Sequence, residues 1–492
     1  MNLMLNKILL SAYGIFLFIL FIYSVNSFFL LLYYRRKRNV SPEERGILDF
    51  KPVTIQLPIY NEMYVAERLI EAVCEIDYPR NLLEIQVLDD SDDETKTIID
   101  NVVRKKKKSG YDIKVIRREK RTGYKAGALK HGLKTASGYY IAIFDADFIP
   151  APDFLMKTLK YFSSPKIGMV QTRWGHLNEN FSLLTMLQAM ALNGHFVIEQ
   201  TVRNRKGFFI NFNGTGGVWR KDCILDAGNW HEDTVAEDVD LSYRAQLKGW
   251  KFVYLNNYTT QAELPVEMNA LKTQQYRWTK GTVQAARKLL PQIWSSGESF
   301  EKKLQGTFHL TSSLVFPFIL MLGIFTLPMV MLKSLHIFND YFNFLSFFIV
   351  SLFASFMFYL YAQKEIYANW KRKILLFPIF LVGSMGFSIN NTKAVLEGMF
   401  SDNNEFIRTP KFNIKEKTDS FFDKKYRVNF KKNSIVFIEF LLSLYSLTAI
   451  LIAVSLKEYS AIPFAAMYFL GFTIIFYLSF KGNFIQKRWR KG

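Results

Sequence analysis

The sequence predicts an α/β domain with a mostly parallel sheet, attached to a bundle of membrane-spanning helices. From about Lys51 to Lys303, short β-branched runs alternate with helical patterns, which is typical of a mostly parallel sheet. Apolar runs long enough to cross a bilayer lie on both sides of this region. Half of the 492 residues are hydrophobic and 22% are charged, which argues against both a purely soluble and a wholly embedded chain.

The first predicted element is a membrane anchor. Residues Ile8–Tyr34 are apolar almost throughout, and the basic run Arg35–Arg38 follows them directly. A signal peptide has its charges before a shorter apolar core and a cleavage site after it, so this order is the wrong one. We therefore predict that residues 1–38 form an N-terminal transmembrane anchor whose C-terminal end lies in the cytoplasm.

The α/β domain is predicted to occupy residues 50–303, on the cytoplasmic side. A helix is expected at Glu62–Cys74. In such sheets ligands bind beyond the carboxyl ends of the strands, and acidic pairs follow two predicted strands, at Asp89 and at Asp145. The four expected strands are Val53–Leu57, Ile85–Leu88, Ile113–Ile116 and Tyr139–Phe144.

The C-terminal third is apolar again. Its predicted membrane spans are Phe308–Leu332, Phe342–Tyr361, Ile435–Leu456 and Ile462–Phe480. Between the two pairs of spans lies Ile374–Phe400, whose apolar part is short and is broken by Pro378, Gly383 and Gly386. We predict an interfacial or re-entrant helix there.

Charge counting supports this arrangement. The basic stretches Lys364–Lys373, Arg408–Lys432 and Lys481–Lys491 are all expected in the cytoplasm, and five spans with an external N-terminus satisfy that expectation. The predicted domains after the α/β domain are two spans and an interfacial helix in residues 304–400, a cytoplasmic gating-like loop in 401–433, and two spans with a basic tail in 434–492.

The net charge and the cysteines limit the function classes. A formal net charge of +20 fits the lysines and arginines that collect in loops beside a membrane. No nucleic-acid partner is expected, because the basic residues do not interleave with aromatics on one element. Cys74 and Cys223 are too few for a disulfide framework, and the six histidines are scattered, so any metal is expected to have oxygen ligands.

Asp145 and Asp147 are the predicted metal ligands. Two carboxylates one residue apart, in a turn after an apolar strand, can both face one divalent ion, Mg²⁺ or Mn²⁺. Such an ion would bridge them to the diphosphate of a nucleotide. The alternative is a solvated surface turn.

Two further segments are predicted to hold the rest of a nucleotide. Asp89 and Asp90 end a strand, and an acidic side chain there can hydrogen-bond the ribose or the base; the alternative is a helix N-cap. Lys125, within a glycine-containing turn, offers a point charge to a phosphate or a base carbonyl.

Glu237 and Asp238 are the candidate catalytic carboxylates. A partly buried carboxyl group beside a second acid has a raised pKa, which suits a general base that takes a proton from a hydroxyl group. The alternative interpretation, a helix start capped by Asp233 and Thr234, is compatible with this role, because the helix would hold the carboxylate in place.

The third element is the group Gln274, Arg277 and Trp278. An arginine can neutralise a leaving diphosphate, and an indole can stack on the apolar face of a sugar ring. The alternative is an amphipathic helix on the membrane surface with an interfacial tryptophan.

Taken together, these motifs resemble the membrane-integrated family 2 glycosyltransferases of the cellulose-synthase type, and more closely the cellulose-synthase-like mannan and glucomannan synthases. The resemblance covers roughly residues 50 to 410. It rests on the acids above, on Gln274–Trp278, and on the stretches Leu57–Glu62, Val87–Ser91, Gly123–Leu129, Phe144–Phe148 and Phe212–Arg220.

This resemblance implies a GT-A fold and a single displacement that inverts the transferred sugar. It implies a nucleotide-diphospho-sugar donor held by Asp89, Asp90, Lys125, Asp145, Gln274 and Arg277, and Asp238 as the base. It places Phe212, Asn213, Gly214 and Trp278 near the acceptor. It also implies a gating segment at Glu405–Lys411, where Arg408 and Pro410 depart from the relatives' pattern.

Two functions are carried forward. The first is a processive transferase that adds a hexose from GDP-mannose or UDP-glucose to a β-glycan and exports it through the inner (plasma) membrane. The alternative is a non-processive glycolipid synthase, similar to ceramide or diacylglycerol glucosyltransferases. The sequence does not reveal the donor sugar, the acceptor or the oligomeric state.

Overall fold

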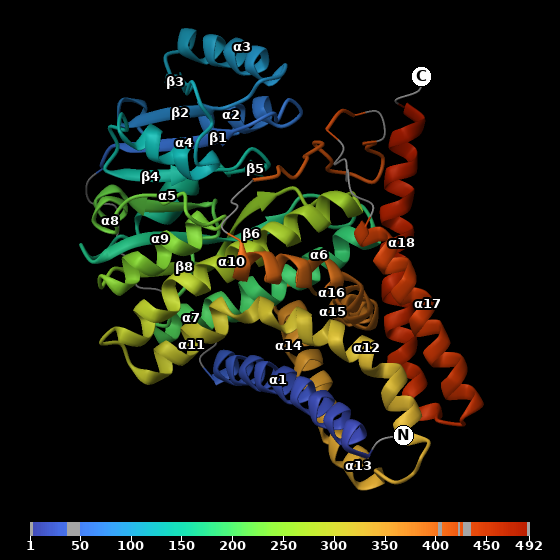
Figure 1. The fold of residues 1–492 in the computed structure, drawn as a ribbon. Coiled ribbons are helices and arrows are strands. Elements are labelled where there is room, and N and C mark those ends of the chain that lie inside the picture. Colours follow the sequence, from blue (N-terminus) through green and yellow to red (C-terminus); the bar gives the residue numbers. More distant parts are fainter. Residues whose placement is uncertain (1–2, 37–49, 402–405, 422–423, 427–433, 490–492) are drawn as a thin grey trace.

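The computed structural model describes residues 3–36, 50–401, 406–421, 424–426 and 434–489 (Figure 1). An α/β domain occupies the upper part of the view, and long helices extend from it below and to the right (Figure 1). The predicted combination of an α/β domain with a helical bundle is confirmed.

The sheet has eight strands in the order β3-β2-β1-β4-β7-β6-β8-β5. Four of its seven strand pairs are parallel and three are antiparallel, so the sheet is mixed rather than mostly parallel. The four predicted strands form the parallel half, while β7 and β5 run against their neighbours. The strands are β1 Val53–Ile59, β2 Leu83–Asp89, β3 Asp112–Ile116, β4 Tyr140–Ile143, β5 Phe148–Ile149, β6 Ile167–His176, β7 Gly217–Arg220 and β8 Lys251–Ala262.

The parallel half forms where it was predicted because helices cover both of its faces. Helices α2 (Ala66–Cys74) and α3 (Thr95–Lys108) pack on one face, and α4 (Tyr124–Leu133) packs on the other. Strands buried on both sides read as continuous apolar runs, which is how β1 and β2 appear in the sequence.

The other helices of this domain bring the remaining motifs to the sheet. They are α5 (Phe154–Leu159), α6 (Leu183–Asn193) continuing through Gly194–Gln200 into α7 (Thr201–Lys206), α8 (Lys221–Asp226), α9 (Glu237–Leu247) and α10 (Met268–Ser295). Helix α10 carries the Gln274–Trp278 group and leads through α11 (Phe300–Leu310) into the helical bundle (Figure 1).

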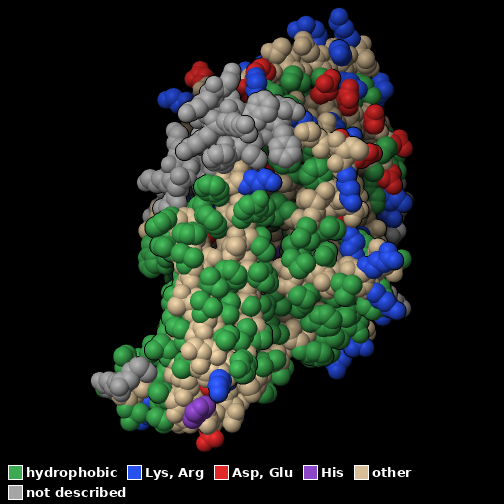
Figure 2. Space-filling model, turned by 90° about the vertical axis from the view of Figure 1, so that its right-hand side faces the viewer, with side chains coloured by type: hydrophobic (Ala, Val, Ile, Leu, Met, Phe, Trp, Pro, Cys, Tyr) green, Lys and Arg blue, Asp and Glu red, His purple; other side chains and the backbone are tan. Residues whose placement is uncertain are grey.

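Among the described residues, six helical stretches are long and apolar enough to cross a membrane, which indicates a multi-pass membrane protein. Hydrophobic side chains cover most of the lower part of one face of the molecule, and charged ones gather toward its upper end (Figure 2). The long helices are α1 (Leu3–Arg36), α12 (Val315–Lys333), α14 (Val350–Ile366), α16 (Phe377–Phe400), α17 (Ser434–Ser455) and α18 (Ile462–Trp489), with the shorter α13 (Asn339–Ser346) and α15 (Trp370–Ile374) between them.

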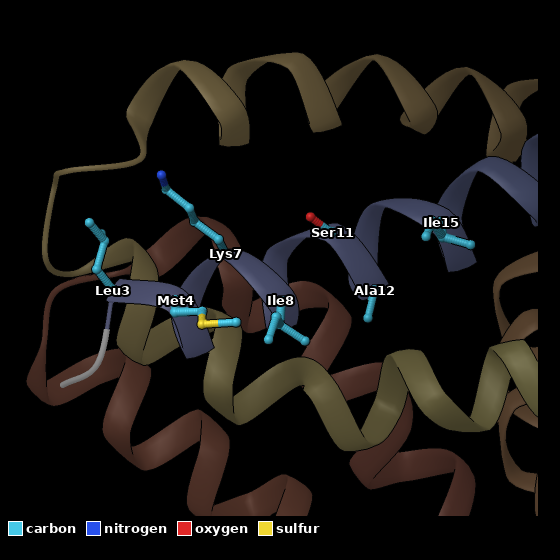
Figure 3. A pocket seen from close by; sticks show the side chains of 7 residues that line it. All are labelled: Leu3, Met4, Lys7, Ile8, Ser11, Ala12 and Ile15. Atoms are coloured by element: carbon cyan, nitrogen blue, oxygen red, sulfur yellow. The ribbon is translucent and has the colours of Figure 1, made fainter.

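One side of α1 carries a shallow hollow. Figure 3 shows the seven side chains that line it, and they recur about every four residues, as one face of a helix requires. Met4 is 70% exposed, and Ile8 and Ile15 are more than half exposed. On a helix this apolar, such a face is suited to contact with lipid.

Helix α16 coincides with the predicted interfacial helix. Its second half packs on α10, where Asn390 donates a hydrogen bond to the Lys272 carbonyl and Gly398 lies against Val283. By length and composition the stretch could also cross, so the interfacial placement stays a prediction. The predicted boundary at residue 38, and parts of the gating-like loop, lie outside the described residues.

Candidate active site

One edge of the sheet gathers the predicted acids. Strand β1 pairs in parallel with both β2 and β4, so their carboxyl ends lie side by side. Strand β2 ends at Asp89, while Glu62 and Asp145 follow the ends of β1 and β4. Strand β7 runs the other way, which brings the preceding loop, Gly214–Gly216, to the same edge. The Asp145 amide donates a hydrogen bond to the Thr215 hydroxyl oxygen, 2.9 Å away, and fixes this junction.

Lys125 connects the two halves of the site. Its ammonium lies 2.5 Å from Asp145 Oδ1, 3.9 Å from Glu237 Oε1, and donates to the Gly214 carbonyl at 2.9 Å. Burial opposes the charge on this lysine, but Asp145 and Glu237 outweigh burial and raise its pKa. Burial also raises the pKa of Asp145, and Lys125 opposes that rise.

Asp147, the second predicted metal ligand, already forms an ion pair with a lysine. Lys411 Nζ lies 2.5 Å from Asp147 Oδ2 and donates to the Glu263 carbonyl at 2.7 Å. The next amide, that of Phe412, donates to Glu263 Oε1 at 2.9 Å. Lys411 comes from residues 406–414, which we call the docked segment. The resemblance implied a gating segment at Glu405–Lys411, which overlaps the docked segment, but the sequence did not reveal these contacts, and the gating role stays a prediction.

The docked segment covers two further charged groups. Arg408 forms an ion pair with Glu62 at 3.2 Å. The Arg277 guanidinium lies 4.3 Å from the centre of the Phe406 ring and donates to the Ile407 carbonyl at 3.3 Å. Burial raises the pKa of Glu62 to about 7, against the effect of Arg408. The segment thus adds two cationic side chains, those of Lys411 and Arg408, to the carboxylates of this edge.

The two candidate catalytic carboxylates begin α9. Burial raises the pKa of Asp238 to about 7, and the neighbouring charge of Glu237 adds to this effect. The Val239 amide donates to Asp238 Oδ1 at 2.9 Å. Gly214 has a φ of +78°, and a β-carbon there would lie 3.2 Å from Asp238 Oδ2. The helix start that the sequence offered as an alternative is present, but Asp233 and Thr234 do not cap it: the residue before α9 is Ala236, which provides no side-chain cap. The helix start holds the Asp238 carboxylate close to Gly214.

A third acid of this segment, Asp240, is fully buried and has a different environment. It pairs with Arg244 at 2.7 Å and with Lys288 of α10 at 2.8 Å. His231, Asp233 and Asp240 offer ligand atoms within 4.8 Å of one another. However, the Lys288 ammonium also lies 2.7 Å from Asp233, so this cluster already has its cation. It links α10 to the helix that begins with the candidate base.

The predicted nucleoside carboxylates are both paired with arginines that the sequence did not single out. Asp89 is buried and accepts from Arg117 Nε at 2.8 Å. Asp90 accepts two hydrogen bonds from Arg118, one of them at 3.0 Å, and Arg118 also binds the carbonyls of the turn before α4. The N-cap alternative is wrong, because α3 begins only at Thr95.

The resemblance placed Phe212, Asn213 and Gly214 near the acceptor, but these residues lie in different surroundings. The Phe212 ring is fully buried in the core beside Trp219, away from the open edge. Asn213 instead lies next to Gly214, and its side-chain oxygen accepts from Gln200 at 3.2 Å. His195 lies within 3.4 Å of the same oxygen, a contact that no sequence pattern indicated.

Gln274 and Trp278 face a cavity of about 1500 Å³ that continues from α10 into the helical bundle as far as Lys333 and Ser460. The Trp278 ring lies 6.3 Å from the Trp174 ring. Only three of the lining residues are charged, Glu267, Lys333 and Lys481. Of the predicted site residues, Gln274 and Trp278 therefore line this cavity, whereas Lys125, Asp145, Asp147, Glu237, Asp238 and Arg277 do not.

Known proteins resemble mainly the α/β part of the chain. Residues 51–281 match the family described as "Glycosyltransferase like family 2". "Glucomannan 4-beta-mannosyltransferase 7" of Arabidopsis thaliana is 41% identical over 255 residues, 51% of this chain and 46% of that protein. "Glucomannan 4-beta-mannosyltransferase 2" of the same plant is 43% identical over 256 residues, 51% of this chain and 48% of that protein. The chain thus spans about half the length of the curated relatives it matches.

Among solved structures, the chain is similar to the mannosyltransferase PcManGT from Pyrobaculum calidifontis in complex with GDP-Man and Mn²⁺. The sequence identity is 18% and the TM-score is 0.49, over 78% of this chain and 99% of the other.

Proposed function

We propose that the chain is a membrane-bound hexosyltransferase that extends a β-glycan, because residues 51–281 match the glycosyltransferase-like family 2. The observation that carries the proposal is the position of Lys125, which contacts Asp145 on one side and Gly214 on the other, where Gly214 lies against Asp238. A cation held between an acidic turn and a candidate base suits the diphosphate of a sugar nucleotide.

The proposed donor is GDP-mannose or UDP-glucose. Of the two, we favour the mannose donor, because the similar plant proteins are named as mannosyltransferases. The nucleoside would lie at the ends of β2 and β4, near Asp89 and Asp90, with Gln274 and Arg277 of α10 on the opposite side. Arg277 is surrounded by Asp145, Glu237, Asp147 and Glu62, so it can bring a positive charge to a diphosphate in this edge.

Asp145 and Asp147 are proposed to hold a divalent ion. The residues fit such an ion, because both carboxylates already attract ammonium groups, those of Lys125 and Lys411, at 2.5 Å. Carboxylate oxygens are the ligands that Mg²⁺ and Mn²⁺ prefer. When bound, the ion would neutralise the leaving diphosphate. Lys411 has to leave Asp147 before this site can fill.

Asp238 is proposed to act as the base, with Glu237 beside it. The acceptor oxygen forms the new bond to the anomeric carbon while the bond to the diphosphate breaks, and the hydroxyl proton passes to Asp238. One displacement of this kind inverts the sugar configuration. A pKa of about 7 is suited to a base that works near neutral pH.

The product is proposed to leave through the cavity, past Trp278. This requires a cytoplasmic α/β domain, an inner-membrane location and an interfacial α16. The packing of half of α16 on α10 supports its interfacial placement. The glycolipid alternative is favoured by one observation: the cavity walls are mainly apolar and would also fit an acyl chain.

Donor and product can be tested together. The purified full-length protein in lipid vesicles receives radiolabelled GDP-mannose or UDP-glucose with Mn²⁺ or Mg²⁺, and the product is sized. A long, alkali-stable polymer is expected from one of the two donors. A single sugar on extractable lipid would support the glycolipid alternative, and transfer from neither donor would contradict both.

A second arm tests the metal. EDTA is expected to stop turnover, and Mn²⁺ or Mg²⁺ in excess of the chelator is expected to restore it. Full turnover in EDTA would contradict the role proposed for Asp145 and Asp147.

A further inference from the structure

The helical bundle contains one fully buried ion pair that reaches the site helix. Lys272 of α10 lies 2.5 Å from Glu439 of α17, and the two side chains are 1% and 0% exposed. Lys272 also donates to the Ser479 hydroxyl of α18 at 3.3 Å, while its carbonyl accepts from Asn390 of α16. Four helices therefore meet at this lysine.

Stability alone is a poor reason for such a pair. Taking both charges out of water costs several kcal/mol per ion, and well-packed apolar residues of similar volume are often as stable. Among the described residues, Glu439 Oε2 has no hydrogen-bond partner, so the carboxylate is only partly compensated. An ionisable residue one turn inside a candidate span is therefore better explained by a role in function.

The position of the pair indicates what that role is. Lys272 lies two residues before Gln274 and six before Trp278 on α10, and both of these residues line the cavity. At the other half of α10, Lys288 pairs with Asp240, on the helix that begins with Glu237 and Asp238. Helix α10 is thus held at two points, by Lys288 to Asp240 of α9, the helix that carries the candidate base, and by Lys272 to the last two membrane helices.

We propose that the Lys272–Glu439 ion pair is a positioning contact that sets α10 against α17 and α18, and so places Trp278 where the acceptor enters the cavity. This inference rests on the proposed function. Both residues act through α10 and touch neither substrate nor product.

The test compares variants of the full-length protein in lipid nanodiscs. E439Q and K272M break the pair, K272E/E439K reverses it, and K272M/E439L replaces it with apolar side chains. The matched control is E458Q, which breaks the Lys333–Glu458 pair (3.1 Å) in the same bundle; this pair joins the end of α12 to the residues after α17. The measurements are hexose transfer, the KM values for donor and acceptor, and hydrogen exchange of residues 268–280.

We expect E439Q and K272M to raise exchange in α10 and to lower transfer on the order of tenfold to a hundredfold, the effect of a misplacement of about 1 Å. The acceptor KM should rise while the donor KM stays within about twofold. The reversed pair should recover a large part of the lost transfer. The apolar double variant should be as stable as the wild type and still defective in transfer.

Three results would overturn the inference. They are equal exchange in E439Q and E458Q, full transfer by the apolar double variant, and a defect confined to the donor KM. If the wild-type protein transfers no hexose at all, the proposed function fails. The exchange comparison of E439Q with E458Q then decides by itself whether the pair holds α10.

Discussion

Two regions of the molecule hold ammonium–carboxylate pairs at the same distance and in different surroundings. At the site edge, Lys125–Asp145 and Lys411–Asp147 lie at 2.5 Å, with carboxylate side chains that are 32% and 14% exposed. In the bundle, Lys272–Glu439 also lies at 2.5 Å, and neither side chain reaches solvent. Distance alone therefore does not distinguish the three pairs.

The difference lies in what can replace a lost partner. When one of the site pairs separates, its carboxylate is partly exposed and can bind water or another cation, so separation costs less than it does for a fully buried pair. When a buried pair separates, each ion is left in a medium that cannot solvate it. The site pairs are consequently suited to exchange with ligand, and the bundle pair is suited to holding helices in place.

The largest expected effect is loss of transfer with the fold intact. Asp238→Asn should lower transfer by about 10²–10⁴-fold, because general acid–base catalysis contributes that much, while the protein stays folded and nucleotide binding stays near wild type. Turnover assays and nucleotide titration check this. Asp222→Asn, an exposed acid in α8, is the control and should be neutral. Lost nucleotide binding in a folded protein would instead move Asp238 to the donor site.

The bundle is expected to behave in the opposite way. Glu439→Gln leaves Lys272 buried without its counter-charge and should destabilise the protein by about 3–5 kcal/mol. Thermal unfolding of the detergent-solubilised protein compares it with Asp238→Asn. Equal melting temperatures for the two variants would remove the contrast between the two regions.

The pH dependence sharpens the comparison within the site. Burial raises the pKa of Asp238 from 3.8 to about 7, so kcat/KM should rise with pH and level off above about pH 7, where the base is ionised. Below the pKa the fall should be roughly tenfold per pH unit. A flat profile between pH 5 and 8 would contradict Asp238 as the base.

The raised pKa of Asp238 also determines how the stability of the folded protein depends on pH. Between the ordinary pKa and about 7 the folded state binds more protons than the unfolded state, so this carboxyl group makes the protein less stable as pH rises through that window. Glu62, whose pKa is also raised to about 7, acts in the same direction. Asp238→Asn should reduce the difference in unfolding temperature between pH 5 and pH 8.

A smaller effect is expected at the docked segment. Lys411→Ala removes the ammonium that competes for Asp147, so Mn²⁺ should bind about fivefold more tightly, the equivalent of about 1 kcal/mol for a partly exposed pair. Calorimetric titration with Mn²⁺ measures this directly. Lys415→Ala, at an exposed position beyond the segment, is the control. Unchanged or weaker Mn²⁺ binding by Lys411→Ala would show that Lys411 does not compete with the ion.

The smallest expected effect concerns Gly214. Gly214→Ala carries a backbone cost of about 1–2 kcal/mol at positive φ and also pushes a methyl group toward Asp238 Oδ2, at 3.2 Å. Gly207→Ala has a similar φ of +69° with nothing within 4 Å, so it reports the backbone cost alone. Both variants should lose similar stability, while only Gly214→Ala should lose transfer, by a few-fold. Equal activity of the two would show that the Asp238 carboxylate tolerates the added methyl group.

The predictions from sequence were most accurate for segments in which consecutive residues are apolar because both faces of the element are covered. Strands β1 and β2 are covered on both faces, so their apolar runs stood out, and the long apolar helices stood out for the same reason. The second half of the sheet was missed: β6 and β8 have irregular register, and β7 is only four residues long. The antiparallel pairs of this half also join strands that are far apart in the sequence, so no local pattern predicts them.

Within the candidate site, too, some residues could be predicted from the sequence and others could not. The acidic pairs could be located because each follows its own strand, and Glu237–Asp238 could be located because the two carboxylates adjoin in the sequence. Their counter-charges could not be, since Arg118, Lys411 and Lys288 come from segments that no local pattern connects to Asp90, Asp147 and Asp240.

The sequence by itself determined the α/β domain, the apolar helices and the types of charged residue available to the site. Only the tertiary structure decided which charges meet, as Lys272 and Glu439 do although they are far apart in the chain. The physical reason is that hydrophobic periodicity is a local property of neighbouring residues. The partner of a charge depends instead on chain paths that bring distant residues together, and on how much water they exclude.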